Sequence, residues 1–191
     1  MGCGIGTDYL PSQSAGDWVR YADHVVVASP VAEKDVDRRD YTSGPYAYRV
    51  NRLVTFGKVD LLWSRPRPRR VVGEGFGLVA AGWRVNRDGG ARVEVLTPDA
   101  PRLETGHTYL LALRWDEGRW NVLGEGAAVP FDDHVAGRGE WCGRELREQD
   151  VALAERFSRQ DDHSLEKAVV GKGQQAVVRE LRQAVSRSRR E

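Results

Sequence analysis

The clearest pattern in this chain is a pair of apolar, strand-length segments joined by a tight polar turn. The run Tyr109-Leu110-Leu111-Ala112-Leu113 is almost unbroken in apolar residues, which is typical of a strand buried on both faces. Asp116-Glu117-Gly118 supplies a turn in which the glycine can adopt a positive φ, and Trp115 and Trp120 flank it. We therefore predict a β-hairpin here. A short edge segment at Val129-Pro130-Phe131 should follow, since proline cannot donate a ladder hydrogen bond.

Short apolar or alternating segments, separated by glycine and proline, run through the first two thirds of the chain. They predict further strands at residues 24–32, 46–54, 61–63, 71–85 and 92–96. The polar segment 33–45 predicts a loop, and 86–90 predicts a turn. Short strands at this spacing favour a mainly β fold, an OB-like antiparallel barrel of five or six strands, over a sandwich.

Helical spacing occurs on both sides of this β-rich region. Ser14 is placed to cap a short helix that carries Trp18 on its apolar side. Beyond residue 133, helical patterns cover residues 146–157, 164–170 and 174–187, the last with a clear apolar stripe. We expect three parts, α+β overall: a flexible tail at 1–13, the OB-like barrel at 14–133, and a helical C-terminal extension at 134–191.

Composition and charge exclude several classes of protein. Of the 191 residues, 40% are hydrophobic and 30% charged, and the formal net charge is +1, which is normal for a globular domain with an extension. No apolar run approaches the ~20 residues that cross a bilayer, so no transmembrane segment is expected. A nucleic-acid partner is not expected either, because general nucleic-acid binders carry a stronger basic excess.

The two cysteines, Cys3 and Cys142, leave the cellular compartment open. They can form one disulfide in an oxidising compartment, whereas two free thiols are expected in a reducing one. No signal peptide is visible, so the sequence as it stands predicts a cytoplasmic protein. Gly2-Cys3 resembles the end of a bacterial lipoprotein cleavage box. If the gene starts upstream of Met1, Cys3 would carry a lipid anchor and the protein would be extracytoplasmic.

Residues 64–70, Ser-Arg-Pro-Arg-Pro-Arg-Arg, form a basic, proline-rich stretch. The prolines favour an extended geometry in which Arg65, Arg67, Arg69 and Arg70 project outward. These arginines could contact phosphates or an acidic partner, and the alternative is a solvated loop. Together with the polar segment 34–45 they are the candidate partner-binding surface.

No motif in the sequence predicts a catalytic site. Gly73-x-Gly75-x-Gly77 precedes an apolar strand instead of opening a helix, which favours strand bending over phosphate binding. Asp-Asp-His occurs at 132–134 and 161–163, but adjacent residues rarely supply a full set of metal ligands. Ser164-Leu165-Glu166-Lys167 matches S-x-x-K without its companion motifs. We therefore expect no enzyme activity, no metal and no cofactor, with His24 and His107 in structural roles.

Three segments resemble the netrin-like domain, the OB-like barrel of the tissue inhibitors of metalloproteinases. They are Ala22-Asp23-His24-Val25-Val26-Val27 with Glu33-Lys34, the segment from Leu103 to Leu113, and Val129-Pro130-Phe131-Asp132. The resemblance covers residues 14–133 and implies the fold. In that family a free N-terminal cysteine of a Cys-x-Cys motif chelates the zinc of the protease. Here Met1 and Gly2 precede Cys3, and Ile5 replaces the second cysteine, so the implied inhibition requires processing that exposes Cys3.

The whole chain also resembles secreted or membrane-anchored proteins of actinobacteria whose function is unknown. These observations predict a non-enzymatic module that binds a protein partner. One alternative is metalloprotease inhibition through a processed Cys3. The other is single-stranded nucleic-acid binding, in which Tyr46, Tyr48 and Trp83 would stack on bases.

Overall fold

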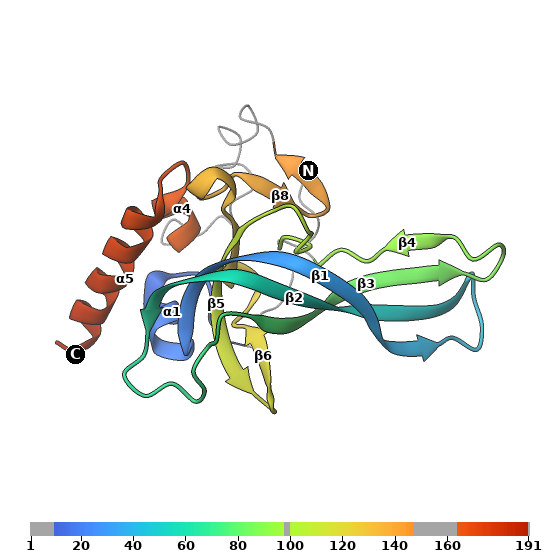
Figure 1. Ribbon diagram of the computed structural model, residues 1–191, viewed down its shortest axis with the longest axis horizontal. Helices are drawn as coiled ribbons and strands as arrows, with labels where there is room; N and C mark the ends of the chain where they lie inside the picture. Colours follow the sequence, from blue (N-terminus) through green and yellow to red (C-terminus); the bar gives the residue numbers. More distant parts are fainter. Residues whose placement is uncertain (1–9, 98–99, 147–163, 191) are drawn as a thin grey trace.

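In the computed structural model, the described residues are 10–97, 100–146 and 164–190. A β-barrel lies at the centre, a long β-ribbon projects from one side of it, and helices cover the other side (Figure 1). The elements in chain order are α1 (Ala15–Tyr21), β1 (His24–Asp40), β2 (Tyr46–Ser64), β3 (Phe76–Asn86), β4 (Arg92–Glu94), β5 (Tyr109–Asp116), β6 (Arg119–Val122), η1 (Glu125–Ala127), β7 (Ala128–Pro130), η2 (Asp132–His134), β8 (Gly139–Trp141), β9 (Arg144–Leu146), α4 (Leu165–Val169) and α5 (Gln174–Ser188).

Five strands close the barrel in the order β1-β2-β3-β6-β5, and β5 pairs back onto β1. The prediction of a mainly β fold with a barrel of five or six strands is thereby confirmed, and the closed five-strand barrel is consistent with an OB-like arrangement. One neighbouring pair differs from the expected antiparallel arrangement, because β3 and β6 run parallel and share the single pair Leu78↔Trp120. An odd number of strands that otherwise alternate in direction must contain one parallel contact, so the closure itself requires this exception.

The barrel wall formed by β1 and β5 separates two hydrophobic cores. The barrel interior contains Leu111 and Leu113 of β5, while Leu110 and Ala112 of the same strand face a second core beneath the helices. All four side chains are fully buried. This two-sided burial explains why the segment lacks polar positions. The β5–β6 hairpin was also predicted correctly, and its turn places Gly118 at a φ of 76°.

The predicted loop at 33–45 is wrong over its first part. Strand β1 continues to Asp40 and pairs with β2 as far as Tyr48, so only residues 41–45 connect the two strands. A polar sequence can occupy a strand when both faces of the ribbon are exposed, since period-two alternation arises only where one face is buried. The predicted strand at 71–85 begins later, at Phe76.

The C-terminal segment packs on the barrel. Ser164 caps α4, and α5 spans Gln174–Ser188 with Ala176, Val177, Leu181 and Ala184 buried, as the apolar stripe predicts. These helices share a core with Trp18 of α1 and with the outer face of β5. The β8–β9 hairpin within 134–191 was not predicted, and β9 includes residue 146, where a helix was expected. The rest of that predicted helix lies outside the described residues.

Candidate functional site

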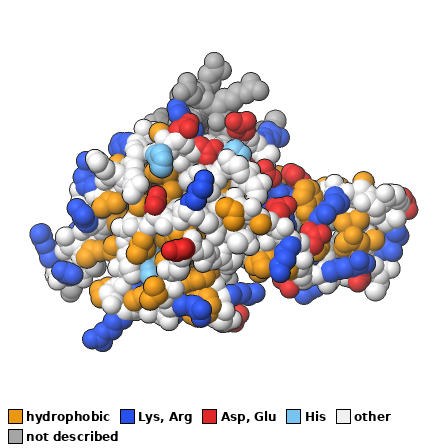
Figure 2. All heavy atoms as spheres, in the orientation of Figure 1, with side chains coloured by type: hydrophobic (Ala, Val, Ile, Leu, Met, Phe, Trp, Pro, Cys, Tyr) orange, Lys and Arg blue, Asp and Glu red, His pale blue; other side chains and the backbone are white. Residues whose placement is uncertain are grey.

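The β-ribbon that projects from the barrel is the most prominent surface of the molecule (Figure 1). We call residues 33–51 and 82–95 the arm. It consists of the distal parts of β1, β2 and β3 together with β4. Strand β1 pairs with β5 only over His24–Ala28, so beyond this point one side of β1 borders no other strand of the described chain. Acidic, basic and hydrophobic side chains are interspersed along the arm (Figure 2).

Arginine side chains lie over the aromatic rings of the arm. The pairs are Tyr46 with Arg84, Tyr48 with Arg38, and Trp83 with both Arg92 and Arg102. We call this set the arginine–aromatic ladder. Two carboxylates hold its arginines in place: Asp40 accepts hydrogen bonds from Arg38 at 3.0 and 2.7 Å, and Asp35 accepts from Arg92 at 2.8 and 2.9 Å. The ladder is therefore ordered by contacts within the arm.

A bulge in β3 at the base of the arm presents two carbonyl groups to buried guanidinium groups. Val50 pairs with Trp83 but Arg52 with Ala80, so the register shifts at Ala81–Gly82. Gly82 is required here, because a Cβ at this position would lie 2.3 Å from the carbonyl oxygen of Val50. The Ala81 carbonyl accepts from Arg52 Nε at 3.0 Å, and the Gly82 carbonyl accepts from an Arg102 terminal nitrogen at 3.2 Å.

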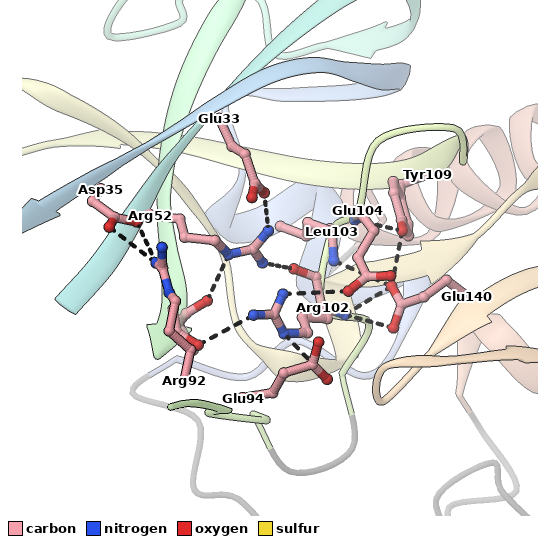
Figure 3. A network of polar contacts seen from close by, with 12 residues as sticks. Glu33, Asp35, Arg52, Arg92, Glu94, Arg102, Leu103, Glu104, Tyr109 and Glu140 are labelled. Carbon is pink, nitrogen blue, oxygen red and sulfur yellow. Dashed lines mark hydrogen bonds and ion pairs between the residues drawn. The ribbon is translucent and has the colours of Figure 1, made fainter. Parts of the chain in front are cut away.

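Arg52 and Arg102 lie next to each other in this base (Figure 3). Arg52 is 1% exposed and also donates to Glu33 and to the carbonyl of Arg102. Arg102 donates to Glu104 at 3.3 Å, and its Nε lies 3.9 Å from a Glu94 carboxylate oxygen. Burial and the positive charge of Arg52 lower the pKa of Arg102. The Arg102 side chain nevertheless remains a cation, because guanidinium groups do not deprotonate in proteins.

Glu140 connects this base to the β8–β9 hairpin (Figure 3). Its carboxylate is 1% exposed and accepts from the backbone N–H groups of Arg102 (2.9 and 2.8 Å), Leu103 (3.2 Å) and Gly143 (2.7 Å), and from the Tyr109 hydroxyl (2.8 Å). Burial and the adjacent Glu140 charge raise the pKa of Tyr109, so its hydroxyl stays protonated and donates. The carboxylate fixes the turn in which Leu103 adopts a φ of 64°.

This network supports the base of the arm. Sequence reasoning missed Arg52, although a signal was present. Arg52 lies in the same alternating row as Val50, Val54 and Phe56, all of them buried. An arginine at an inward position of such a row indicates a buried ion network.

The Arg65–Arg70 segment lies at the other end of the β1–β2 pair from the tip of the arm. His24 pairs with Ser64 at the first end and Asp40 with Tyr48 at the second, up to about 50 Å away along an extended strand. Segments 34–45 and 65–70 therefore do not form one continuous surface. The assignment of the arginines to partner binding stays a prediction.

Three of these four predicted binding arginines contact other parts of the protein. Arg65 donates to the carbonyl of Arg20 at 2.7 Å, and Arg69 donates to Asp23 through its backbone N–H and its guanidinium. The guanidinium of Arg70 lies 4.4 Å from the ring centroid of Trp115. Arg67 is exposed and makes no hydrogen bond, ion pair or ring contact with the described residues.

Asp23 anchors this loop and makes stability depend on pH. Burial alone raises its pKa, but hydrogen bonds from the Trp115 and Arg69 backbones and the Arg69 side chain outweigh burial and lower it. A carboxylate with a lowered folded-state pKa stabilises the fold above about pH 4, and this stabilisation disappears as the pH falls through the folded-state pKa.

We therefore expect Asp23→Asn to destabilise the protein by about 2 kcal/mol at pH 7 and by less at pH 3. Urea unfolding at both pH values measures the difference. The control is Asp60→Asn, at an exposed position, with an expected change under about 0.5 kcal/mol. If Asp23→Asn lowered the free energy of unfolding equally at both pH values, the ionised Asp23 carboxylate would not be the source of the stabilisation.

The remaining candidates from the sequence have structural contacts. Asp132 accepts from the Thr108 N–H at 2.7 Å and lies 2.6 Å from His107 Nδ1, while His24 Nε2 lies 2.8 Å from the Arg70 carbonyl oxygen. The close approach of Gly75 to the Phe56 carbonyl, 2.9 Å from an added Cβ, agrees with glycines that allow strand packing. Within the described ranges, no group of three or more His, Cys, Asp or Glu side chains is arranged to hold a metal ion. The second Asp-Asp-His triplet lies outside the described residues.

Cys142 is disulfide-bonded and 8% exposed in the β8–β9 turn. The other cysteine of the chain, Cys3, lies outside the described residues.

None of the helices in the described part of the chain has the length and apolar character needed to span a bilayer. No protein family, curated protein or solved structure matches the chain. The resemblance to the netrin-like domain therefore stays a prediction, and the barrel itself is what the structure shows.

Proposed function

We propose that this protein is a non-enzymatic binding module and that the arm binds a protein partner. The observation that carries the proposal is the arginine–aromatic ladder, a set of Arg, Tyr and Trp side chains that contact one another on a projecting ribbon. Tyr, Trp and Arg are the residues enriched at the energetic centres of protein interfaces.

The buried charged groups at the base of the arm support this proposal because they hold the arm rigidly on the barrel. A buried ion network such as Arg52, Arg102 and Glu140 contributes little net stability compared with apolar packing, because desolvating the charges is costly. It does fix the direction in which the arm leaves the barrel. An arm ordered before binding loses less conformational entropy when a partner docks.

The two alternative functions have less support. Metalloprotease inhibition would need a free thiol at Cys3. Cys142 is disulfide-bonded, and the chain has only these two cysteines. For nucleic-acid binding, Tyr46, Tyr48 and Trp83 already contact arginines of the same chain, and a stacked base would have to displace them.

Site-directed photo-cross-linking tests the proposal in extracts of the natural host. A photoreactive residue at Ser43, in the exposed tip of the arm, is expected to give a cross-linked species of defined mass. Combining it with Arg38→Glu and Arg84→Glu is expected to reduce the yield at least tenfold, because the ladder then loses two of its four cations.

Arg67→Glu provides the matched control, since Arg67 is exposed and belongs to the other candidate surface. If the arm binds the partner, this variant leaves the yield from Ser43 unchanged. Loss of the species in Arg67→Glu, with retention in the Arg38/Arg84 variant, would refute the arm and assign binding to the Arg65–Arg70 loop.

A further inference from the structure

The outward face of α5 carries a concentration of positive charge, the second in the chain beside the Arg65–Arg70 segment. Residues 164–190 contain seven Lys and Arg against two Glu, although the whole chain has a net charge of only +1. Within α5 the positive charges are all arginines: Arg179, Arg182 and Arg187, with Arg189 and Arg190 directly following the helix. Figure 2 shows Lys and Arg side chains along the side of the molecule that α5 covers.

The spacing of these residues forms one continuous stripe. Positions 175, 179, 182, 186 and 190 follow each other at three- and four-residue intervals, so they share one face of the helix. The buried positions Val177, Leu181 and Ala184 occupy the opposite face against the barrel. The stripe therefore lies on the exposed side of α5, opposite the side that packs on the core, and extends about 20 Å, at the rise of an α-helix.

The arginines of this stripe are free to meet an external anion. Arg179, Arg182 and Arg190 are exposed, and in the described chain none of them lies within ion-pair distance of a carboxylate. The arginines of the arm and the barrel differ, since most of those contact carboxylates, carbonyls or aromatic rings. Like charges spaced one turn apart along a helix repel one another and destabilise the helix. An anion bound along the stripe would offset this repulsion.

We propose that the arginine stripe of α5 adsorbs to the phosphate headgroups of an anionic membrane surface. A basic cluster on one face of an amphipathic helix binds anionic lipid by charge alone. A protein partner is a poorer fit, because the stripe presents no large apolar side chain to fill a pocket at an interface centre. A long nucleic acid is also a poorer fit, since the remainder of the chain is net negative whereas a flat bilayer touches only this one side.

Adsorption in this orientation places the arm on the far side of the barrel from the membrane (Figure 1). The stripe and the arm are separate surfaces, so this inference does not depend on the function proposed for the arm.

Vesicle sedimentation with the full chain tests the proposal. We expect partition onto vesicles of phosphatidylcholine mixed with phosphatidylglycerol and none onto phosphatidylcholine alone. Raising the salt from about 0.1 M to about 1 M shortens the screening length from about 10 Å to about 3 Å and is expected to release the protein. The combined Arg179→Gln, Arg182→Gln and Arg190→Gln variant is expected to lower the partition coefficient about a hundredfold.

The matched control removes the same amount of charge elsewhere, through Arg39→Gln, Arg49→Gln and Arg144→Gln at exposed positions. It is expected to keep most of the partition. Glutamine retains helix propensity, so circular dichroism should show an unchanged fold in both variants. Three outcomes would overturn the proposal: no partition at low salt, equal loss in the control, or tighter binding to polyglutamate or duplex DNA than to the anionic vesicles.

Discussion

Glu140→Ala is expected to destabilise the protein by about 3 to 5 kcal/mol, measured by urea unfolding at pH 7. The substitution removes the acceptor of three backbone N–H groups and of the Tyr109 hydroxyl, all in a buried site. Each buried donor left without a partner costs about 1 to 3 kcal/mol. It also removes a negative charge from a region that contains two buried guanidinium groups. The loss should therefore far exceed the average effect of a single substitution.

Two controls separate this role from a general sensitivity of the hairpin. Glu145 pairs with Glu140 in the β8–β9 register but is exposed, and Glu145→Ala is expected to change stability by under about 0.5 kcal/mol. Tyr109→Phe removes the hydroxyl that donates to Glu140 and accepts from the Glu104 N–H, and is expected to cost about 1.5 to 2.5 kcal/mol, less than the loss for Glu140→Ala. If Glu140→Ala lost no more than Tyr109→Phe, water would be replacing the carboxylate, and the network would not hold the segment around Leu103.

Hydrophobic patterning predicted the helices and strands whose burial is reflected in the spacing of their apolar residues. Strand β5 is apolar at consecutive positions because each face contacts a different core, and α5 has an apolar stripe because one face does. The arm has neither pattern along β1, so residues 33–40 were expected to be a loop. Its strand pairing depends on the partner strand β2, whose own alternation was recognised.

The polar base of the arm could be predicted only in part. Arg52 breaks a row of buried positions within one strand, and that break is visible in the sequence. Glu140 is different, because its donors come from residues 102, 103, 109 and 143, and nothing local indicates that they meet. The same holds for Asp23, whose partners Arg69 and Trp115 are distant in sequence. Sites assembled from such separate segments require the tertiary structure.

Reduction of the disulfide at Cys142 is expected to lower the free energy of unfolding by about 2 to 5 kcal/mol. Cys3 is the chain's other cysteine, so we predict a Cys3–Cys142 bond. Such a bond closes most of the chain into one loop and restricts the unfolded ensemble strongly. Without reductant, the intact mass should be lower by two hydrogens than after reduction. Peptide mapping should recover the peptide containing Cys3 joined to the one containing Cys142.

A double-substitution comparison tests whether the two cysteines act as one unit. Cys3→Ser and Cys142→Ser should each destabilise by a similar amount, and the double variant should be no less stable than either single one. Additive losses, free thiols in unreduced protein or a covalent dimer would contradict the pairing. If the bond is present in protein from the natural host, Cys3 can carry neither a lipid nor an inhibitory thiolate, and the protein works in an oxidising compartment. The adsorbing stripe of α5 would then be its means of association with a membrane.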